Sequence, residues 1–206
     1  MKFLCLHGNG TNSHVMQLQT APLRHELEDG HDYEFVEGAI EIPMAEGVEA
    51  MSLPEHRFYA YYNPDDLSTA KRAMDQLDDY IATEGPFDVV MGFSAGAVLA
   101  AMYLIQKQRQ AGSVPFKCAV FLASANNTAE MGYLGADVSR DLIRIPTAHI
   151  WGSADQTAPM GGADLSKMCD PTQRFTLVHD AGHELPKQTY LTQAVQGIRK
   201  TVYLAN

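Results

Sequence analysis

A serine between two glycines lies in the segment GFSAG at residues 92–96. The run before it, FDVVM, is typical of a buried strand, and the run after it has an apolar face at helical spacing. A sharp turn from strand to helix exposes the serine hydroxyl above the sheet, at the positive end of the helix dipole. Ser94 is therefore the predicted nucleophile, and the backbone N–H of Ala95 a predicted oxyanion donor. The alternative is an ordinary turn in which Ser94 caps the helix.

A serine nucleophile requires a base and an acid that orients the base. The segment HIWGSAD ends on Asp155 after a strand-like run, and DAGHELP carries His183 on a loop before the last helical segment. The chain order serine, acid, histidine is the order that the α/β-hydrolase fold requires. Asp155 is the predicted acid, with Asp180 as the main alternative, and His183 is the predicted base.

The other histidines near these segments have expected structural roles. His149 falls inside a strand, and His179 falls at a strand end, so neither is placed like a loop residue that reaches a hydroxyl. His179 and His183 have the i, i+4 spacing of a zinc site, but Gly182 and the preceding strand are incompatible with the helix that this spacing requires. We therefore predict no metal site.

The segment HGNGTN at 7–12 directly follows the first predicted strand. Small residues there allow a loop to pass close to a substrate oxygen and point a backbone N–H at it. Asn9 is the preferred second oxyanion donor, and Gly10 is the alternative. His7 is expected to brace this loop.

The same segment permits a different class of function. Gly8 and Gly10 after the first strand, with Glu37 at the end of the second, match part of a dinucleotide-binding fingerprint. Ser13 stands where the third glycine belongs, and this interpretation leaves the serine, the acid and the histidine without a role.

The elements that must position these residues follow a regular alternation. Short apolar runs alternate with segments of helical period, which predicts an α/β fold with a mainly parallel sheet covered by helices on both faces. The predicted strands are 2–7, 33–37, 87–93, 117–123, 147–152 and 174–179. The predicted helices are 14–28, 66–84, 95–110, 160–168 and 187–203.

Two long connections, 38–64 and 124–144, do not fit the alternation. Their Met and aromatic content suits pocket walls or a small cap over an apolar acyl chain, although these side chains could equally cover the sheet edge. The candidate lining residues are Met44, Met51, Phe58, Tyr59, Tyr61, Tyr62, Met131 and Tyr133.

Length and composition limit the remaining possibilities. A chain of 206 residues that is 46% hydrophobic predicts one domain over 1–206. The net charge of −10 argues against nucleic acid and membrane surfaces as partners. Three cysteines, no apolar export segment and no apolar run near the roughly 20 residues of a membrane span predict a soluble, cytoplasmic protein.

Four segments together resemble the fungal family of serine hydrolases, which is related to the human ovarian-cancer-associated hydrolase and to polyketide-releasing thioesterases. These segments are FLCLHGNGTN at 3–12, FDVVMGFSAGA at 87–97, HIWGSAD at 149–155 and DAGHELP at 180–186. The resemblance implies a cytosolic esterase or thioesterase that needs no cofactor, built on a compact sheet. The segment 38–64 departs from the family pattern.

The expected function is cleavage of an acyl ester or thioester through Ser94, releasing an acyl or polyketide chain in secondary metabolism. The alternatives are a general carboxylesterase and a catalytically silent ligand binder on the same fold. The substrate would be a small molecule or a carrier-bound acyl group, and Arg140 and Arg144 are candidates for docking an acidic carrier. The sequence indicates no oligomeric state.

Overall fold

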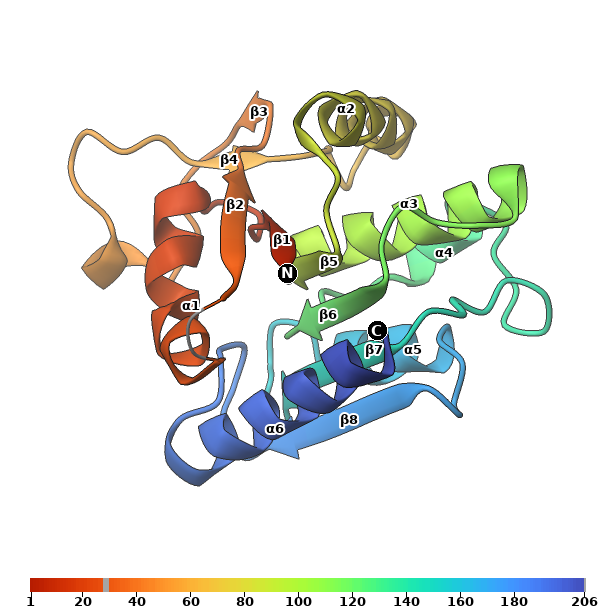
Figure 1. Ribbon diagram of the computed structural model, residues 1–206. Coiled ribbons are helices and arrows are strands. Elements are labelled where there is room, and N and C mark those ends of the chain that lie inside the picture. The colour runs from red at the N-terminus through yellow and green to blue at the C-terminus, as the bar shows by residue number, and fades with distance from the viewer. Residues whose placement is uncertain (28–29, 206) are drawn as a thin grey trace.

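The computed structural model describes residues 1–27 and 30–205, and within them six parallel strands form one sheet. The strand order is β2-β1-β5-β6-β7-β8 (Figure 1). All six predicted strands are present, and the largest shift of an end is two residues. Their bounds are Lys2–Leu6 (β1), Asp32–Val36 (β2), Val89–Phe93 (β5), Cys118–Leu122 (β6), Thr147–Gly152 (β7) and Arg174–His179 (β8).

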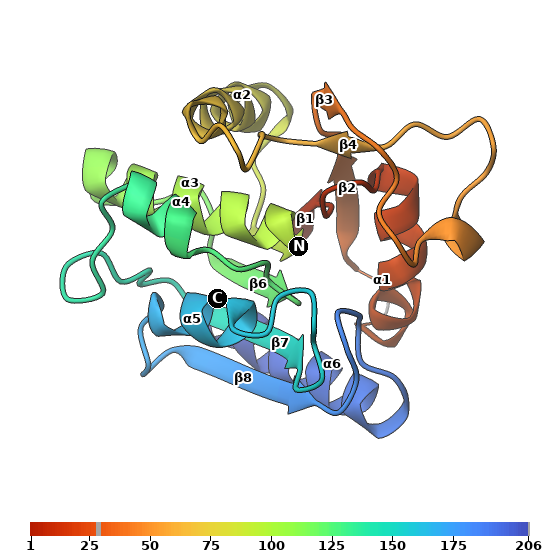
Figure 2. The ribbon, with the colours of Figure 1, turned by 180° about the vertical axis from the view of Figure 1, so that it is seen from behind.

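Helices cover both faces of the sheet, as the alternation predicts (Figures 1 and 2). The bounds are Ser13–Leu27 (α1), Ser68–Glu84 (α2), Ala95–Ala111 (α3), Thr128–Tyr133 (α4), Gly161–Lys167 (α5) and Gln188–Leu204 (α6). Five of them correspond to predicted helices, and the predicted last residue of the first helix, Glu28, lies outside the described residues. The helix α4 was not predicted.

Alternation along each strand divides the core into two clusters. In β1, Phe3 and Cys5 pack with residues of α1 and α6, whereas Leu4 and Leu6 pack with residues of α2 and α3. Because successive side chains point to opposite faces, a strand buried on both faces is apolar throughout. The helix α1 begins where the side chain of Asn12 accepts a hydrogen bond from the N–H of Val15 at 2.8 Å.

The order of the strands reverses at β1, which pairs in parallel with β2 on one side and with β5 on the other. In parallel sheets, ligands bind beside the carboxyl ends of the strands at such a switch point. The loop 7–12 follows β1, and Ser94 follows β5. The predicted nucleophile and oxyanion loop therefore meet at the edge of the sheet where this fold places a ligand.

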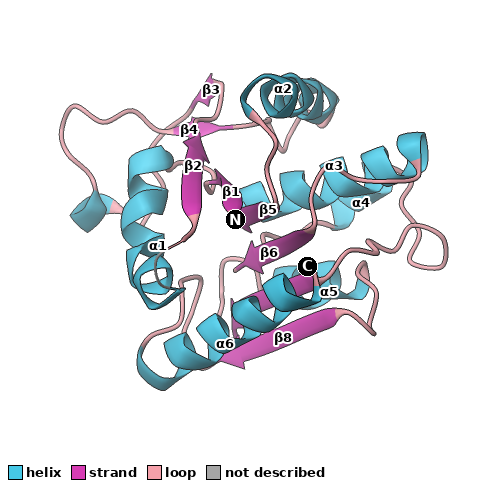
Figure 3. Ribbon diagram, in the orientation of Figure 1, coloured by secondary structure: helices cyan, strands magenta, loops and turns pink. Residues whose placement is uncertain are grey.

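The first inserted segment, 38–64, lies near this edge beside α1 in both ribbon views (Figures 1 and 2). It contains a two-stranded antiparallel sheet of Ile40–Glu41 (β3) and Tyr59–Ala60 (β4), and a short 3-10 helix over Glu49–Met51. Figure 3 shows that most of the remaining segment is loop.

The second inserted segment, 124–144, lies mostly elsewhere. Its helix α4 packs Met131 into the core beside α3, and the chain then runs to the amino end of β7. Arg144 lies three residues before β7, at the edge opposite Ser94. Arg140 pairs only loosely with Asp137, at 3.9 Å. Docking of an acidic carrier by these two arginines stays a prediction.

The three cysteines are free thiols and are buried. Burial raises the pKa of Cys118 and of Cys169 to about 12, so neither is a thiolate near neutral pH. Over the described residues, no helix is both long and apolar enough to span a bilayer.

Candidate active site

Ser94 lies on a strained turn between β5 and α3. Its backbone has φ 53° and ψ −118°, a conformation that L-residues rarely adopt. The N–H of Ser94 donates to the carbonyl of Leu122 at 3.0 Å, which fixes the turn against the neighbouring strand. A side chain at Gly96 would meet the backbone of Leu6 and His7, so the close approach of α3 to β1 requires glycine there.

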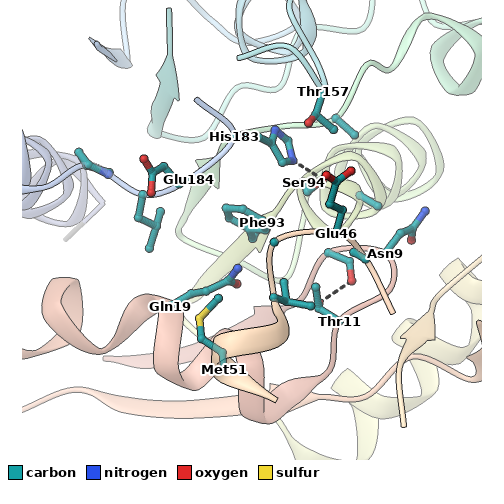
Figure 4. A pocket seen from close by; sticks show the side chains of 18 of the residues that line it. Asn9, Thr11, Gln19, Glu46, Met51, Phe93, Ser94, Thr157, His183 and Glu184 are labelled. Carbon is teal, nitrogen blue, oxygen red and sulfur yellow. Dashed lines mark hydrogen bonds between the residues drawn. The ribbon is translucent and has the colours of Figure 1, made fainter. Parts of the chain in front are cut away.

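The three residues predicted to form a catalytic triad are joined by hydrogen bonds. The Nε2 atom of His183 lies 2.8 Å from the Oγ atom of Ser94 (Figure 4). Its Nδ1 atom lies 2.6 Å from Oδ2 of Asp155. With Nδ1 donating to the carboxylate, Nε2 is free to accept the serine proton. The arrangement can remove a proton from Ser94 and stabilise the resulting imidazolium.

Asp155 is held in place by backbone contacts. Its side chain is buried, and its second oxygen, Oδ1, accepts hydrogen bonds from the N–H groups of Thr157 and Ala158 at 2.9 and 2.8 Å. Both carboxylate oxygens are thus partnered, which compensates for the removal of the charge from water. Asp180, the alternative acid, is exposed, and among the described residues the carboxylate that pairs with His183 is that of Asp155.

Two residues that line the cavity with Ser94 have, within the described part of the chain, a backbone N–H without a hydrogen-bond partner. Among the described residues, no hydrogen bond is found for the N–H of Asn9 or of Ala95. Both residues line the same cavity as Ser94. Gly10 was the alternative donor, and this alternative is wrong, because its N–H donates to the carbonyl of Tyr59 at 3.0 Å.

His7 is completely buried behind the oxyanion loop. Its Nδ1 atom lies 2.7 Å from the carbonyl of Gly8, and its Nε2 atom lies 3.0 Å from the N–H of Gly38. The Nε2 atom also lies 3.1 Å from Oε1 of Glu37, so the ring connects the oxyanion loop to residues 37 and 38. The N–H of His7 also donates to the hydroxyl of Tyr61 at 2.9 Å. His7 therefore braces the loop, as expected.

The other histidines do not reach the serine. His149 is buried, and burial lowers its pKa to about 3, so its ring stays neutral. His179 is also buried, and its pKa is lowered by the same cause. Both nitrogens of His183 are occupied by Ser94 and Asp155, so the zinc alternative for His179 and His183 has no support in the geometry.

Glu37 has a local structural role that differs from ribose binding. Its carboxylate accepts hydrogen bonds from the N–H and the hydroxyl of Ser13 at 3.0 and 3.1 Å. It therefore caps the first turn of α1, where a dinucleotide-binding protein would need a glycine. This contact leaves the dinucleotide alternative without its acidic residue.

A cavity of about 720 Å³ opens above Ser94. It lies between residues 19–23 of α1, the segment 45–51 and the loop from His183 to the start of α6 (Figure 4). Its lining consists of Gly8, Asn9, Thr11, Gln19, Pro22, Leu23, Ala45, Glu46, Gly47, Val48, Met51, Phe93, Ser94, Ala95, Ala125, Thr157, His183, Glu184, Leu185, Pro186, Lys187 and Leu191.

Most of the predicted pocket residues lie outside this lining, and only Met51 belongs to it. The prediction is therefore wrong for Met44, Phe58, Tyr59, Tyr61, Tyr62, Met131 and Tyr133. Two causes account for the error: Tyr61, Tyr62 and Met131 are packed into the core, and Met44 and Tyr133 are 41% and 47% exposed. The second inserted segment contributes only Ala125, so it is not a pocket wall.

Several lining residues could not be recognised from the sequence. Gln19, Pro22 and Leu23 share one face of α1, and Leu191 comes from α6. The i, i+3, i+4 spacing marks a helix face, but the spacing cannot say that this face borders a cavity. The mouth also carries the charges of Glu46 and Glu184, the latter paired with Lys187 at 2.8 Å.

Comparison with known proteins agrees with this geometry. Residues 1–195 match the family described as Serine hydrolase (FSH1). Esterase FPY3 of Fusarium mangiferae is 40% identical over 197 residues, which cover 91% of this chain and 89% of the relative.

Solved structures share the fold at low sequence identity. A carboxylesterase of Bacillus cereus has a TM-score of 0.57 at 18% identity, with 97% of this chain and 87% of that one covered. The RedJ thioesterase from the prodiginine biosynthetic pathway in Streptomyces coelicolor has a TM-score of 0.58 at 13% identity, with 95% and 85% covered. These likenesses identify an α/β-hydrolase fold. Together with the match over 1–195, they show that the chain is a serine hydrolase and belongs to the serine hydrolase (FSH1) family.

Proposed function

We propose that Ser94 is the nucleophile that cleaves an acyl ester or thioester. His183 takes the hydroxyl proton as Oγ attacks the carbonyl carbon, and Asp155 stabilises the imidazolium. The N–H groups of Asn9 and Ala95 hold the oxyanion. The tetrahedral intermediate then collapses, the bond to the leaving oxygen or sulfur breaks, and His183 donates its proton to that leaving group.

The second half of the reaction releases the acid. A water molecule gives a proton to His183 and attacks the acyl-enzyme, and Ser94 leaves with that proton as a free hydroxyl. The observation that carries the proposal is the pair of short contacts, 2.8 Å to Ser94 and 2.6 Å to Asp155, around one imidazole. No further protein group is required to balance the protons.

The cavity favours an apolar acyl chain. Pro22, Leu23, Val48, Met51 and Leu185 line it with apolar surface, and its volume is in the range of sites for drug-sized ligands. We propose that the protein releases such a chain, of acyl or polyketide type, from a thioester or ester in secondary metabolism. The RedJ thioesterase offers a precedent on this fold by its assignment to a biosynthetic pathway.

A general carboxylesterase that acts on uncharged esters is the second candidate. It is favoured by the acidic residues at the mouth, because Glu46 is unpaired in the described structure and would repel an acidic carrier protein or an anionic leaving group. The relative from Fusarium mangiferae, esterase FPY3, is likewise named as an esterase.

A paired substrate series distinguishes these candidates. The rate of hydrolysis would be measured for acyl-pantetheine thioesters of increasing chain length and for the matching oxyesters, with Ser94→Ala as the blank. Preference for thioesters that is lost in the blank supports chain release from a thioester. Equal or faster turnover of the oxyesters favours the carboxylesterase, and turnover that persists in the blank contradicts both.

A further inference from the structure

One peptide unit of the oxyanion loop has very different surroundings at its two ends. The N–H of Asn9 has no hydrogen-bond partner among the described residues, whereas the carbonyl of Gly8, in the same peptide unit, accepts several hydrogen bonds. The hydroxyl of Thr11 donates to this carbonyl at 2.6 Å, and the N–H of Thr11 donates to it at 3.3 Å. The Nδ1 atom of His7 lies 2.7 Å from the same oxygen, and because a carbonyl can only accept, the ring is a third donor.

This peptide unit lies against the nucleophile. A side chain on Gly8 would come within 3.2 Å of the Cβ atom of Ser94, and Asn9, Thr11 and Ser94 line the same cavity (Figure 4). The Gly8–Asn9 bond is trans, so its C=O and its N–H point in opposite directions. The groups that hold the Gly8 carbonyl therefore also determine where the N–H of Asn9 points.

The local sequence does not fix the orientation of this peptide. Asn9 stands between Gly8 and Gly10, and glycine permits backbone rotations that other residues exclude. Contacts from outside the peptide must therefore hold it, and the hydroxyl of Thr11 makes the shortest of them from a buried side chain. The backbone of Thr11 is held independently, because its carbonyl accepts a hydrogen bond from the N–H of Tyr59 at 2.8 Å. The hydroxyl can thus be removed while this backbone anchor stays.

The donors on the carbonyl also affect the strength of the N–H. Hydrogen bonds in a chain polarise one another, so a peptide whose oxygen accepts hydrogen bonds is a stronger donor at its N–H. A donor that is already oriented stabilises a transition state without reorganisation as charge develops. We propose that Thr11 is a positioning residue, whose hydroxyl fixes and polarises the Gly8–Asn9 peptide so that the N–H of Asn9 is directed at the substrate oxyanion. This inference rests on the proposed function and adds to it a side chain that acts through the backbone.

The experiment compares variants of Thr11 with and without the hydroxyl. Thr11→Val replaces the hydroxyl by a methyl group, Thr11→Ala removes it without a replacement, and Thr11→Ser retains it. With an activated oxyester we expect kcat to fall about tenfold in the first two variants, less than the roughly 10²-fold or more for loss of an oxyanion donor itself. KM should be unchanged, because the oxyanion is present only in the transition state. Thr11→Ser should retain most of the wild-type kcat.

Binding of a transition-state analogue distinguishes oxyanion stabilisation from a general structural defect. When a trifluoromethyl ketone reacts, the Oγ atom of Ser94 bonds to its carbonyl carbon, His183 takes the hydroxyl proton, and the carbonyl oxygen becomes an oxyanion. The Ki of this ketone should rise about tenfold in Thr11→Val and Thr11→Ala, in parallel with the fall in kcat. The Ki of the corresponding alcohol, which has no carbonyl to attack, should be unchanged.

Thr201→Val is the matched control. The hydroxyl of Thr201 donates to the carbonyl of Gly197 at 2.9 Å, and the residue is buried, so this change also removes a buried hydroxyl from a backbone carbonyl. Thr201 lies near the end of α6 and outside the lining of the cavity. We expect this variant to have a lowered Tm and an unchanged kcat, with the wild-type Ki for the ketone.

The outcomes separate this inference from the function on which it rests. Wild-type kcat in both Thr11→Val and Thr11→Ala would overturn the role of the hydroxyl and leave the hydrolase intact. An effect on KM alone, a loss in Thr11→Ser as large as that in Thr11→Ala, or an unchanged Ki for the ketone would also overturn it. Turnover that is the same in Ser94→Ala would instead contradict the proposed function itself.

Discussion

Gly10 and Tyr59 are joined through their backbones: the N–H of Gly10 donates to the carbonyl of Tyr59 at 3.0 Å. In return, the N–H of Tyr59 donates to the carbonyl of Thr11 at 2.8 Å. The strand β4 therefore holds the loop that carries Asn9, which is the proposed oxyanion donor. The first inserted segment thus supports this loop in addition to lining the cavity through residues 45–51.

The change Gly10→Ala tests this support. Gly10 has φ +66°, and a side chain there would meet the backbone N of Ala45 and the carbonyl of Pro43. We expect a decrease in kcat of roughly 10- to 100-fold, the range for impaired oxyanion stabilisation, together with a lowered Tm. Gly135→Ala is the control, since Gly135 has φ +57° and open space around it. The control should lower only the Tm, and an equal loss of kcat there would contradict the interpretation.

The change Asp155→Asn tests the orienting acid. An amide at this position would favour the wrong tautomer of His183, and kcat should fall by about 10⁴-fold. Steady-state hydrolysis of an activated ester measures the effect. Asp180→Asn, at the exposed alternative acid two residues before Gly182, should leave kcat unchanged. The reverse result would make Asp180 the acid.

The change Met51→Trp tests the location of the acyl chain. Met51 lines the cavity, so a larger side chain should shorten the longest acyl chain that is hydrolysed efficiently. Met44 is 41% exposed and lies outside the lining, so Met44→Trp should leave the chain-length profile unchanged. The profile of kcat/KM against chain length measures both variants. Identical profiles for the two would place the chain elsewhere.

The change Glu46→Lys tests the charge at the mouth. Removal of an anion and addition of a cation there should raise kcat/KM for an anionic ester relative to a neutral ester of the same acid, by about two- to fivefold at low salt. Screening should abolish the gain near 1 M salt. Glu49→Lys changes an exposed residue outside the lining by the same charge and serves as the control.

The three predicted triad residues, which the structure brings together, could be found from the sequence because their signals are local. Ser94 lies in one strand–turn–helix unit, and Asp155 and His183 each follow a strand, so the parallel sheet brings all three to the same edge. Gly92 also has a local reason, because it lies against the backbone of Gly96 and Ala97, whereas Gly96 lies against the distant backbone of Leu6 and His7.

The pocket could not be predicted in this way, because its walls come from long-range packing. The Met and aromatic content of 38–64 indicates burial, yet composition cannot distinguish burial in the core from exposure to a cavity. Tyr61 and Tyr62 are packed into the core, and Met51 lines the cavity. The contribution of Gln19 depends on how α1 packs against α6, which no local pattern encodes.

The most direct test of the account is to identify the residue that becomes covalently modified. The protein would be treated with a fluorophosphonate that reacts with activated serines, and the adduct would be located by mass spectrometry of its peptides. The account predicts one adduct, on Ser94, that forms much more slowly in His183→Ala and is absent from Ser94→Ala. Modification at another residue, or undiminished modification in Ser94→Ala, would contradict it.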